Sequence, residues 1–389
     1  ALSTIPLFPS LVLGRLILGL AVGCEAAVVP VLLSEIAPPA SRGKIVGFHQ
    51  LAITVGIAAA GGMGAFLIEV SHGWKWVQAF IAFPALLQGI FSRFVPESPL
   101  WLNRNKNYQK VSQKQNKPHS FDEMIGVNQI EFYETEMRSR NSTWAEVFSE
   151  KMILFKGVTL MALSALTGIN SVMLYSTTIF SLAGLKESTS STAIVAAVNV
   201  LATVAAQRLA DTKGRRFLLL NGIGAMFLAL VALSASLLVS SEDSALQAFL
   251  LVGSVLLFVI GFAIGFGAVG WTVISEIVPS RLRGKACGLF VSANWASNSL
   301  VSLFTLSLIG KFGGEKRGVA VLYLIFSVNC LVAYVFAFQF ISETKGLSLG
   351  ELHPSENFPQ LPKATPKFGG ASSPYSLVME EVEMLPDSP

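Results

Sequence analysis

The sequence predicts an all-α membrane protein whose two halves are related. Hydrophobic residues fill 52% and charged residues only 13% of its 389 positions, whereas soluble domains carry about 25% charged residues. Apolar runs long enough to cross about 30 Å of hydrocarbon as helices recur along the chain. One loop motif, rich in charge and proline, occurs in each half. These three observations favour a duplicated bundle of membrane-spanning helices.

The first three predicted spans cover residues 10–35, 45–69 and 74–95. The first of them ends at an acid, two prolines and two bases, and the third ends at a polar stretch that runs from 96 to 151. Lys, Asn, Gln and Glu are frequent in this stretch, which indicates a solvated loop. The seven or so residues before the first span are interpreted as the stub of an earlier one.

Six further spans are predicted after that loop. They cover residues 152–182, 191–210, 216–240, 246–275, 286–310 and 317–341. A Pro- and Ser-rich tail follows and is expected to be disordered. We therefore expect four units: the remnant of a six-helix bundle at 1–102, a cytoplasmic inter-bundle loop at 103–151, a second six-helix bundle at 152–341 and the tail at 342–389.

The loop motif indicates the duplication. SEIAPPASRGK at 34–44 recurs as SEIVPSRLRGK at 275–285, and PESPLWL at 96–102 is echoed by SETKGLS at 342–348. Three spans precede the motif-bearing span of the second half, but almost nothing precedes that of the first. We therefore expect about three more helices upstream, and twelve spans in two parallel six-helix halves. A genuine nine-span protein is the alternative.

The basic residues indicate sidedness rather than a nucleic-acid partner. Most of the 28 Lys and Arg lie in the tail and in the loops at 37–44, 96–151, 211–216 and 279–285. The positive-inside rule places these loops and the C-terminus in the cytoplasm, at either the plasma membrane or an organelle membrane. The three cysteines show no paired spacing, and the sequence carries no triad, phosphate loop or metal cluster, so no enzyme, cofactor or metal is predicted.

Eight motifs follow one another along the chain: GRLILG at 14, SEIAPPASRGK at 34, PESPLWL at 96, GINSVMLYS at 168, DTKGRR at 211, SEIVPSRLRGK at 275, NWASN at 294 and SETKG at 342. Together they resemble the sugar porter family of the major facilitator superfamily. The resemblance implies a major facilitator fold that lacks about three N-terminal helices. It also implies a secondary carrier that moves a hexose or related polyol by alternating access, with proton coupling left open. A transporter-like sugar sensor and an inactive fragment are the alternatives.

A neutral polyol held inside a bilayer needs uncharged hydrogen-bonding groups and an aromatic face. Asn170 and Asn199 fall near mid-depth in their spans, and Asn294 lies about 13 Å from the inner end by helical rise. The resemblance implies a sugar site with these members: Gln50, Asn170, Asn199, Trp271 and Asn294, with Trp295 and Asn298 beside them. The alternative is that such amides only join helices to one another.

Some positions depart from the family pattern. Ser164 and Ala165 stand where the family usually has two glutamines, and Ala268 and Ser342 stand where it has prolines. The missing amides put glucose in question as the substrate more than transport itself. Trp271 also follows a glycine-rich stretch, GFAIGFGAVGW, which is expected to loosen that span.

Acids and bases recur at the predicted cytoplasmic ends of the spans. The resemblance implies that they form an inner gate that ties the two halves together when shut: Glu35, Arg42, Glu97, Asp211, Arg215, Arg216, Glu276, Arg283 and Glu343. Exposed ion pairs contribute only about 0–1 kcal/mol each, so several of them bias a gate and still let it open. The alternative is that the bases merely obey the positive-inside rule, which does not account for the acids.

Two charges inside the spans need an explanation, Arg15 and Glu25, and His49 is a third group there that could titrate. The arginine that matches Arg15 works, in proton-coupled relatives, with an acid on the first helix. Glu25 lies ten residues deeper, about 15 Å along the axis and on a different face, so it does not pair with Arg15. We predict that Glu25 lines the transport path and titrates, with His49 as a second candidate. The alternative for Glu25 is a protonated acid bonded to a neighbouring helix.

Overall fold

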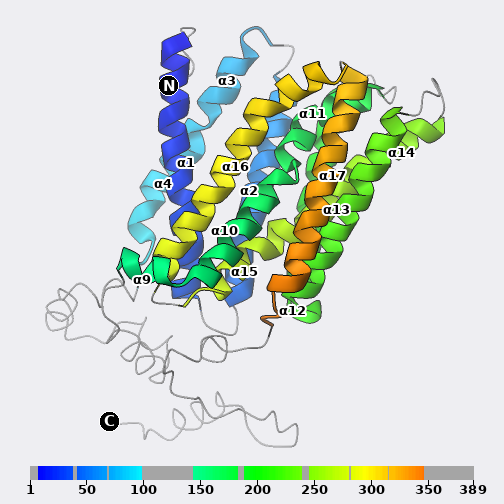
Figure 1. The fold of residues 1–389 in the computed structure, drawn as a ribbon. Coiled ribbons are helices and arrows are strands. Elements are labelled where there is room, and N and C mark those ends of the chain that lie inside the picture. The colour runs from blue at the N-terminus through cyan, green and yellow to red at the C-terminus, as the bar shows by residue number, and fades with distance from the viewer. Residues whose placement is uncertain are drawn as a thin grey trace, which may run out of the picture.

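The structure, a computed structural model, describes residues 8–37, 42–67, 70–98, 143–182, 188–238, 245–279, 282–313 and 315–345. Within these ranges every element is a helix, and the long helices run side by side (Figure 1). The predicted all-α architecture is therefore confirmed. The helices divide into an N-terminal group, α1 to α4, and a C-terminal bundle, α9 to α17.

The N-terminal group has two long helices followed by a broken one. Its elements are α1 (Phe8–Ile36), α2 (Arg42–Phe66), α3 (Gly73–Phe80), α4 (Ala82–Phe91) and a 3₁₀ turn, η2 (Ser92–Phe94). The third predicted span, 74–95, is thus not one continuous helix. Pro84 has no N–H to donate to the carbonyl of Phe80, and its ring crowds that carbonyl, so the helix is interrupted at Ile81.

The C-terminal bundle contains the remaining elements. They are α9 (Trp144–Ser149), α10 (Lys151–Leu166), α11 (Ile169–Leu182), α12 (Ser188–Lys213), α13 (Arg215–Leu238), α14 (Ala245–Phe262), a π-helix η3 (Ala263–Gly270), α15 (Trp271–Glu276), α16 (Arg283–Lys311) and α17 (Glu315–Phe340). The C-terminal ends of α1, α12, α15 and α17 lie together at the lower end of Figure 1. The described helix ends that border the predicted cytoplasmic loops therefore lie at one end of the molecule.

The span predicted at 152–182 is broken in the middle, between α10 and α11. Gly168 takes a φ of +83°, in the left-handed region that favours glycine. The break frees backbone groups that side chains then bind: the Asn329 amide donates to the Leu166 carbonyl at 3.2 Å, and the Thr167 hydroxyl donates to the Ser164 carbonyl at 2.7 Å. A discontinuous helix inside a membrane is stable only with such partners.

The span predicted at 246–275 runs through three elements, α14, the π-helix η3 and α15. Its glycines allow a very close approach to α13. A Cβ added at Gly222 of α13 would lie 2.6 Å from the Gly261 carbonyl oxygen and 2.6 Å from the Gly265 Cα. The expected loosening of the glycine-rich stretch is seen as a π-helix, in which each residue bonds one position farther along than in an α-helix.

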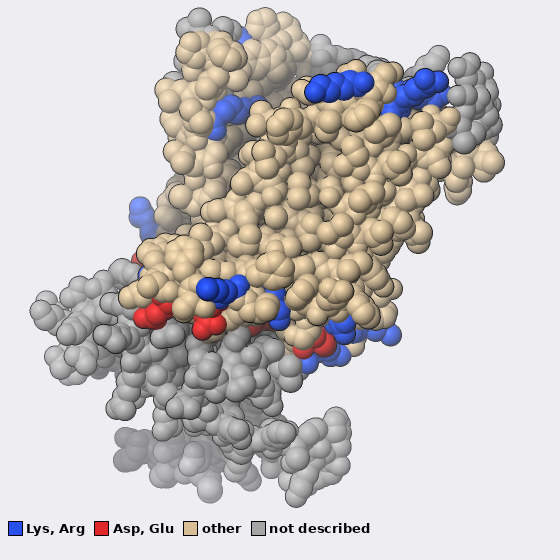
Figure 2. All heavy atoms as spheres, viewed as in Figure 1, with Lys and Arg blue, Asp and Glu red and all other residues tan. Residues whose placement is uncertain are grey.

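Among the described residues, eight helical segments are long and apolar enough to cross a membrane: 8–34, 45–66, 73–94, 151–173, 193–210, 215–238, 246–276 and 316–340. The remaining predicted span, 286–310, forms α16, which has 29 residues but is not among these eight segments. Its asparagines and serines explain the difference. In Figure 2 the acidic atoms of this face gather at the lower end, and an uncharged band separates them from Lys and Arg at the upper end.

The packed core belongs to the C-terminal bundle. Helix α13 supplies its centre, where Leu219, Ile223, Met226 and Leu230 are fully buried. The most apolar stretches of α1 and of α3–α4 contain no buried residue, whereas half of the corresponding stretch of α13 is buried. The core thus lies in the C-terminal bundle, and the N-terminal group lies beside it.

Candidate functional site

Three of the predicted sugar residues form a chain of amides across three helices. The Asn170 amide on α11 donates to the Asn298 side-chain oxygen on α16 at 2.7 Å. The Asn298 amide donates to the Asn294 oxygen one turn away at 3.1 Å, and Asn294 donates to the Met161 carbonyl of α10 at 2.9 Å. Asn170 stays exposed beside the helix break at Gly168. We call Asn170, Asn294 and Asn298 the amide chain.

A second group lies where α2 faces η3 and α15. The ring of His49 contacts the Trp271 indole edge-on, with 6.1 Å between centroids and an angle of 86°. Gln50 is only 8% exposed, and a Cβ added at Gly267 would lie 3.4 Å from its amide nitrogen. Glycine at 267 therefore lets the Gln50 side chain lie against the π-helix. Gln50 and Trp271, predicted together from the motifs, do lie at one inter-helix contact.

The structure separates two other predicted residues from these groups. Asn199 is buried on α12, and within the described contacts its carbonyl accepts the Thr203 hydroxyl while its side chain bonds none of the other predicted site residues. Trp295 is 44% exposed on α16. Their part in a sugar site stays a prediction.

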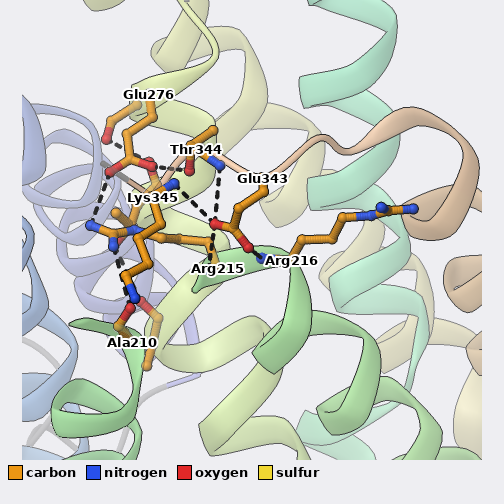
Figure 3. Close-up of polar contacts among 10 residues, drawn as sticks. Ala210, Arg215, Arg216, Glu276, Glu343, Thr344 and Lys345 are labelled. Carbon is orange, nitrogen blue, oxygen red and sulfur yellow. Dashed lines mark hydrogen bonds and ion pairs between the residues drawn. The ribbon is translucent and has the colours of Figure 1, made fainter. Parts of the chain in front are cut away.

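A carboxylate at the start of α13 is held by backbone donors. The Glu343 oxygens accept hydrogen bonds from the main-chain N–H groups of Arg215 at 2.8 Å, Arg216 at 3.1 Å, Thr344 at 3.1 Å and Lys345 at 3.0 Å (Figure 3). The exposed N–H groups of a helix N-terminus bind anions in this way. Burial opposes ionisation of Glu343, but these four donors outweigh it and hold the pKa of the carboxyl below its ordinary value.

Gly214 makes this contact possible. It has a φ of +93°, and a Cβ there would lie only 2.4 Å from a Glu343 oxygen. Any side chain would therefore push the carboxylate away from the helix N-terminus. The motif DTKGRR requires its glycine for this physical reason.

Glu276 joins α15 to the same region. Its carboxylate pairs with the Arg215 guanidinium at 3.4 Å and accepts a hydrogen bond from the Thr344 hydroxyl. Nearby, the Lys345 side chain donates to the Thr212 carbonyl at 2.7 Å. We call Arg215, Arg216, Glu276 and Glu343 the Glu343 cluster. It ties α13, α15 and the segment after α17 together (Figure 3).

The predicted inner gate is only partly seen. The side chains of Glu35, Arg42 and Asp211 lie outside the described residues, and Glu97 is exposed. Arg283 is buried and donates to the Ser275 carbonyl at 3.0 Å. The contacts described for the Glu343 cluster all lie within the C-terminal bundle, so a charged tie between the two halves stays a prediction.

Glu25, the acid within the first span, accepts a hydrogen bond from the Gln88 amide of α4 at 2.8 Å. This bond joins α1 to α4, and Arg15 lies exposed on the same helix as Glu25. The sequence reasoning did not single out Gln88. A glutamine inside an apolar run was the signal, since such residues need a partner in a membrane.

One hydrogen bond between the halves was also missed. The Gln207 amide of α12 donates to the Gly47 carbonyl of α2. Both residues line a small pocket with Ala210, Arg215, Ala268, Val269 and Thr272. The pocket has room for about one water molecule, far too little for a sugar.

Together, the fold and the span-capable helices define a class: a multi-pass helical membrane protein. The chain belongs to the family described as Sugar (and other) transporter, whose profile matches residues 3–355. The sugar porter resemblance drawn from the motifs is thereby confirmed.

Individual relatives agree with this family. The chain is 32% identical to plastidic glucose transporter 4 of Arabidopsis thaliana over 346 residues, which cover 88% of this chain and 62% of that protein. It thus spans less than two thirds of that relative's length. The major facilitator proton:xylose symporter XylE bound to 6-bromo-6-deoxy-D-glucose superposes with a TM-score of 0.73 at 26% identity, over 89% of this chain and 74% of XylE. The inward-open xylose transporter XylE from E. coli superposes with a TM-score of 0.60 at 28% identity, over 84% and 68%.

Proposed function

We propose that this protein is a secondary carrier that moves a neutral hexose or related polyol across a membrane by alternating access. The observation that carries the proposal is the amide chain. Its three asparagines offer donors and acceptors without net charge, on helices that meet beside a break in one of them. Amides of this kind match the hydroxyl groups of a sugar and avoid the cost of a buried charge.

The substrate class follows from the same chemistry. Trp271 and Gln50 lie at the contact of α2 with η3 and α15, where they would add an aromatic face and a further amide. Relatives named for glucose and xylose transport support a sugar as the solute. Ser164 and Ala165 are both buried and offer fewer hydrogen bonds than two glutamines would. We therefore favour a polyol other than glucose.

The inner gate is proposed at the end of the molecule that carries the Glu343 cluster. The positive-inside rule supports the cytoplasm on that side, because the basic loops gather there. Glu35, Arg42, Glu97, Asp211 and Arg283 are proposed as further members of this gate. The organelle or plasma membrane that holds the protein is left open.

Proton coupling is proposed through Glu25. Its described hydrogen-bond partner is the neutral amide of Gln88, and acids inside membrane spans mark proton relays in pumps and transporters. His49, which touches Trp271, and Arg15 are the other proposed participants.

Uptake into proteoliposomes tests the carrier function. We expect saturable, counterflow-competent uptake of labelled hexoses and pentitols, and we expect Asn298→Ala to raise KM by about three- to tenfold, the value of one lost hydrogen bond. Asn221→Ala is the matched control, because its exposed amide donates to the Phe217 carbonyl of its own helix at 2.8 Å. Binding without accumulation would indicate a sugar sensor and contradict the carrier.

A further inference from the structure

The contact of α12 with α2 contains a residue that no motif identified. Gln207 reaches from α12 to the Gly47 carbonyl of α2 and donates to it. The approach depends on glycine, since a Cβ at Gly47 would lie 3.3 Å from the Gln207 Cγ. A larger residue at 47 would therefore separate the two helices by a few tenths of an ångström. The bond joins the N-terminal helices to the C-terminal bundle.

The same contact lies beside the Glu343 cluster. Arg215 of the Glu343 cluster lines the small pocket beside Gly47 and Gln207. Its buried Nε has no hydrogen-bond acceptor among the described residues, and the pocket holds about one water molecule. The room between α2 and α12 beside these residues is thus about that of one water molecule.

The described ion pair and hydrogen bonds of the Glu343 cluster lie within the C-terminal bundle. Arg215, Glu276 and Glu343 bond to one another and to main-chain groups of the C-terminal bundle. The described side-chain hydrogen bond between α2 and α12 is the uncharged one from Gln207. The Glu343 cluster therefore joins elements of the C-terminal bundle to one another. The neutral amide of Gln207 bonds this bundle to α2 of the N-terminal group.

We propose that Gln207 is an inner-gate residue, and that its bond to Gly47 is a latch that breaks each time this end of the carrier opens. The inference rests on the proposed alternating access and adds a residue to it. A single hydrogen bond between membrane helices shifts an equilibrium by only about threefold. Such a weak latch biases the closed state without trapping it, as a carrier requires.

Accessibility of the pocket tests the latch. In the intact protein, with the three native cysteines replaced by serine, Thr272→Cys places a reporter in the pocket wall. A membrane-impermeant maleimide is applied to each face of sealed vesicles in turn. Gln207→Leu keeps the side-chain volume and removes the donor, so we expect labelling from the face that carries the Glu343 cluster to become about threefold faster. Gly47→Ala is expected to act in the same direction.

The controls separate a latch from a general loosening. Asn221→Leu removes an amide that donates within α13 alone, so labelling should stay at the rate of the reporter protein. Concentrated salt should leave the Gln207→Leu effect unchanged, because the bond is uncharged. Equal labelling in Gln207→Leu and Asn221→Leu, or faster labelling from the opposite face, would overturn the proposal. Labelling needs no transported sugar, so a protein that fails the uptake assay but shows the shift would refute the proposed function and keep the latch.

Discussion

The C-terminal bundle and the N-terminal helices have similar composition but very different packing. Helix α13 contacts α14 and α17 through fully buried Leu219, Ile223 and Leu230. Helix α1 is as apolar, yet its most apolar stretch has no buried residue. Apolarity alone therefore does not distinguish a helix that packs against its neighbours from one that presents its surface to lipid or to other helices.

Glycines show the same contrast more clearly. Gly222, Gly261 and Gly265 lie where the backbones of α13 and the π-helix almost touch. In α1 a Cβ added at Gly19 or Gly23 would meet nothing within 4 Å. The same residue type thus enables close packing between α13 and the π-helix and occupies open positions in α1. The comparison predicts opposite outcomes for equivalent substitutions.

The largest effect is expected at the α13 contact. Gly222→Ala places a Cβ 2.6 Å from backbone atoms, which cannot move as a flexible side chain would, and overpacking of this kind costs about 1–3 kcal/mol or more. We expect a clearly lower melting temperature in detergent, measured by intrinsic fluorescence and by monodisperse elution after heating.

Gly19→Ala is the matched test in the N-terminal helices. Alanine is favoured over glycine in a helix by about 1 kcal/mol, and the position is open, so the melting temperature should stay equal or rise. An equal drop in melting temperature for Gly222→Ala and Gly19→Ala would show that the two positions are packed alike in solution, and would contradict the contrast between α13 and α1.

An intermediate effect is expected for the acid of the N-terminal helices. Glu25 is bonded to a neutral amide, whereas Glu343 of the bundle is bonded to backbone donors at a helix start. We expect Glu25→Gln to reduce proton-driven accumulation about tenfold and to spare substrate exchange at equal concentrations. Unchanged accumulation in a pH gradient would remove Glu25 from coupling, and Gln88→Ala shows whether the amide is needed to hold the carboxyl.

The smallest effect is expected at Glu343 and depends on pH. Its pKa lies below the ordinary 4.5 in the folded protein, so the ionised form is favoured by folding. This contribution is fully present above pH 4.5 and is lost as pH falls through the lower, folded-state pKa.

Melting temperatures measured across the acid range check this sign. The native protein should lose stability more steeply than Glu343→Gln below pH 4.5, because glutamine has no charge to lose. The two proteins should run parallel well above that pH. A steeper loss of melting temperature below pH 4.5 in Glu343→Gln than in the native protein would contradict the bonding described for the Glu343 cluster.

Hydropathy predicted where the helices lie, because burial in lipid depends on composition and length. The interruptions at Ile81 and Gly168 were missed, although Pro84 and the glycine itself were their signals. The pair of Arg215 with Glu276 was not specified by the motifs, because partners depend on helix rotation and not on order along the chain.

Contacts between distant helices were the hardest to foresee. Gln207 and Gln88 are single polar residues in apolar runs, and their partners Gly47 and Glu25 follow only from the relative placement of whole helices. The amide chain was predicted as a set of residues, but its order, from Asn170 through Asn298 to Asn294, needed the structure. Whether it binds sugar stays a prediction.

The π-helix before Trp271 acts on orientation as well as on packing. Eight consecutive residues, Ala263–Gly270, are wound more loosely there than in the α-helices on either side. Rewinding this stretch into ordinary α-helix would swivel everything beyond it around the axis, beginning with the Trp271 indole and ending with the Glu276 carboxylate. A single change in helical twist would thus reorient both the Trp271 indole and the Glu276 carboxylate of the Glu343 cluster.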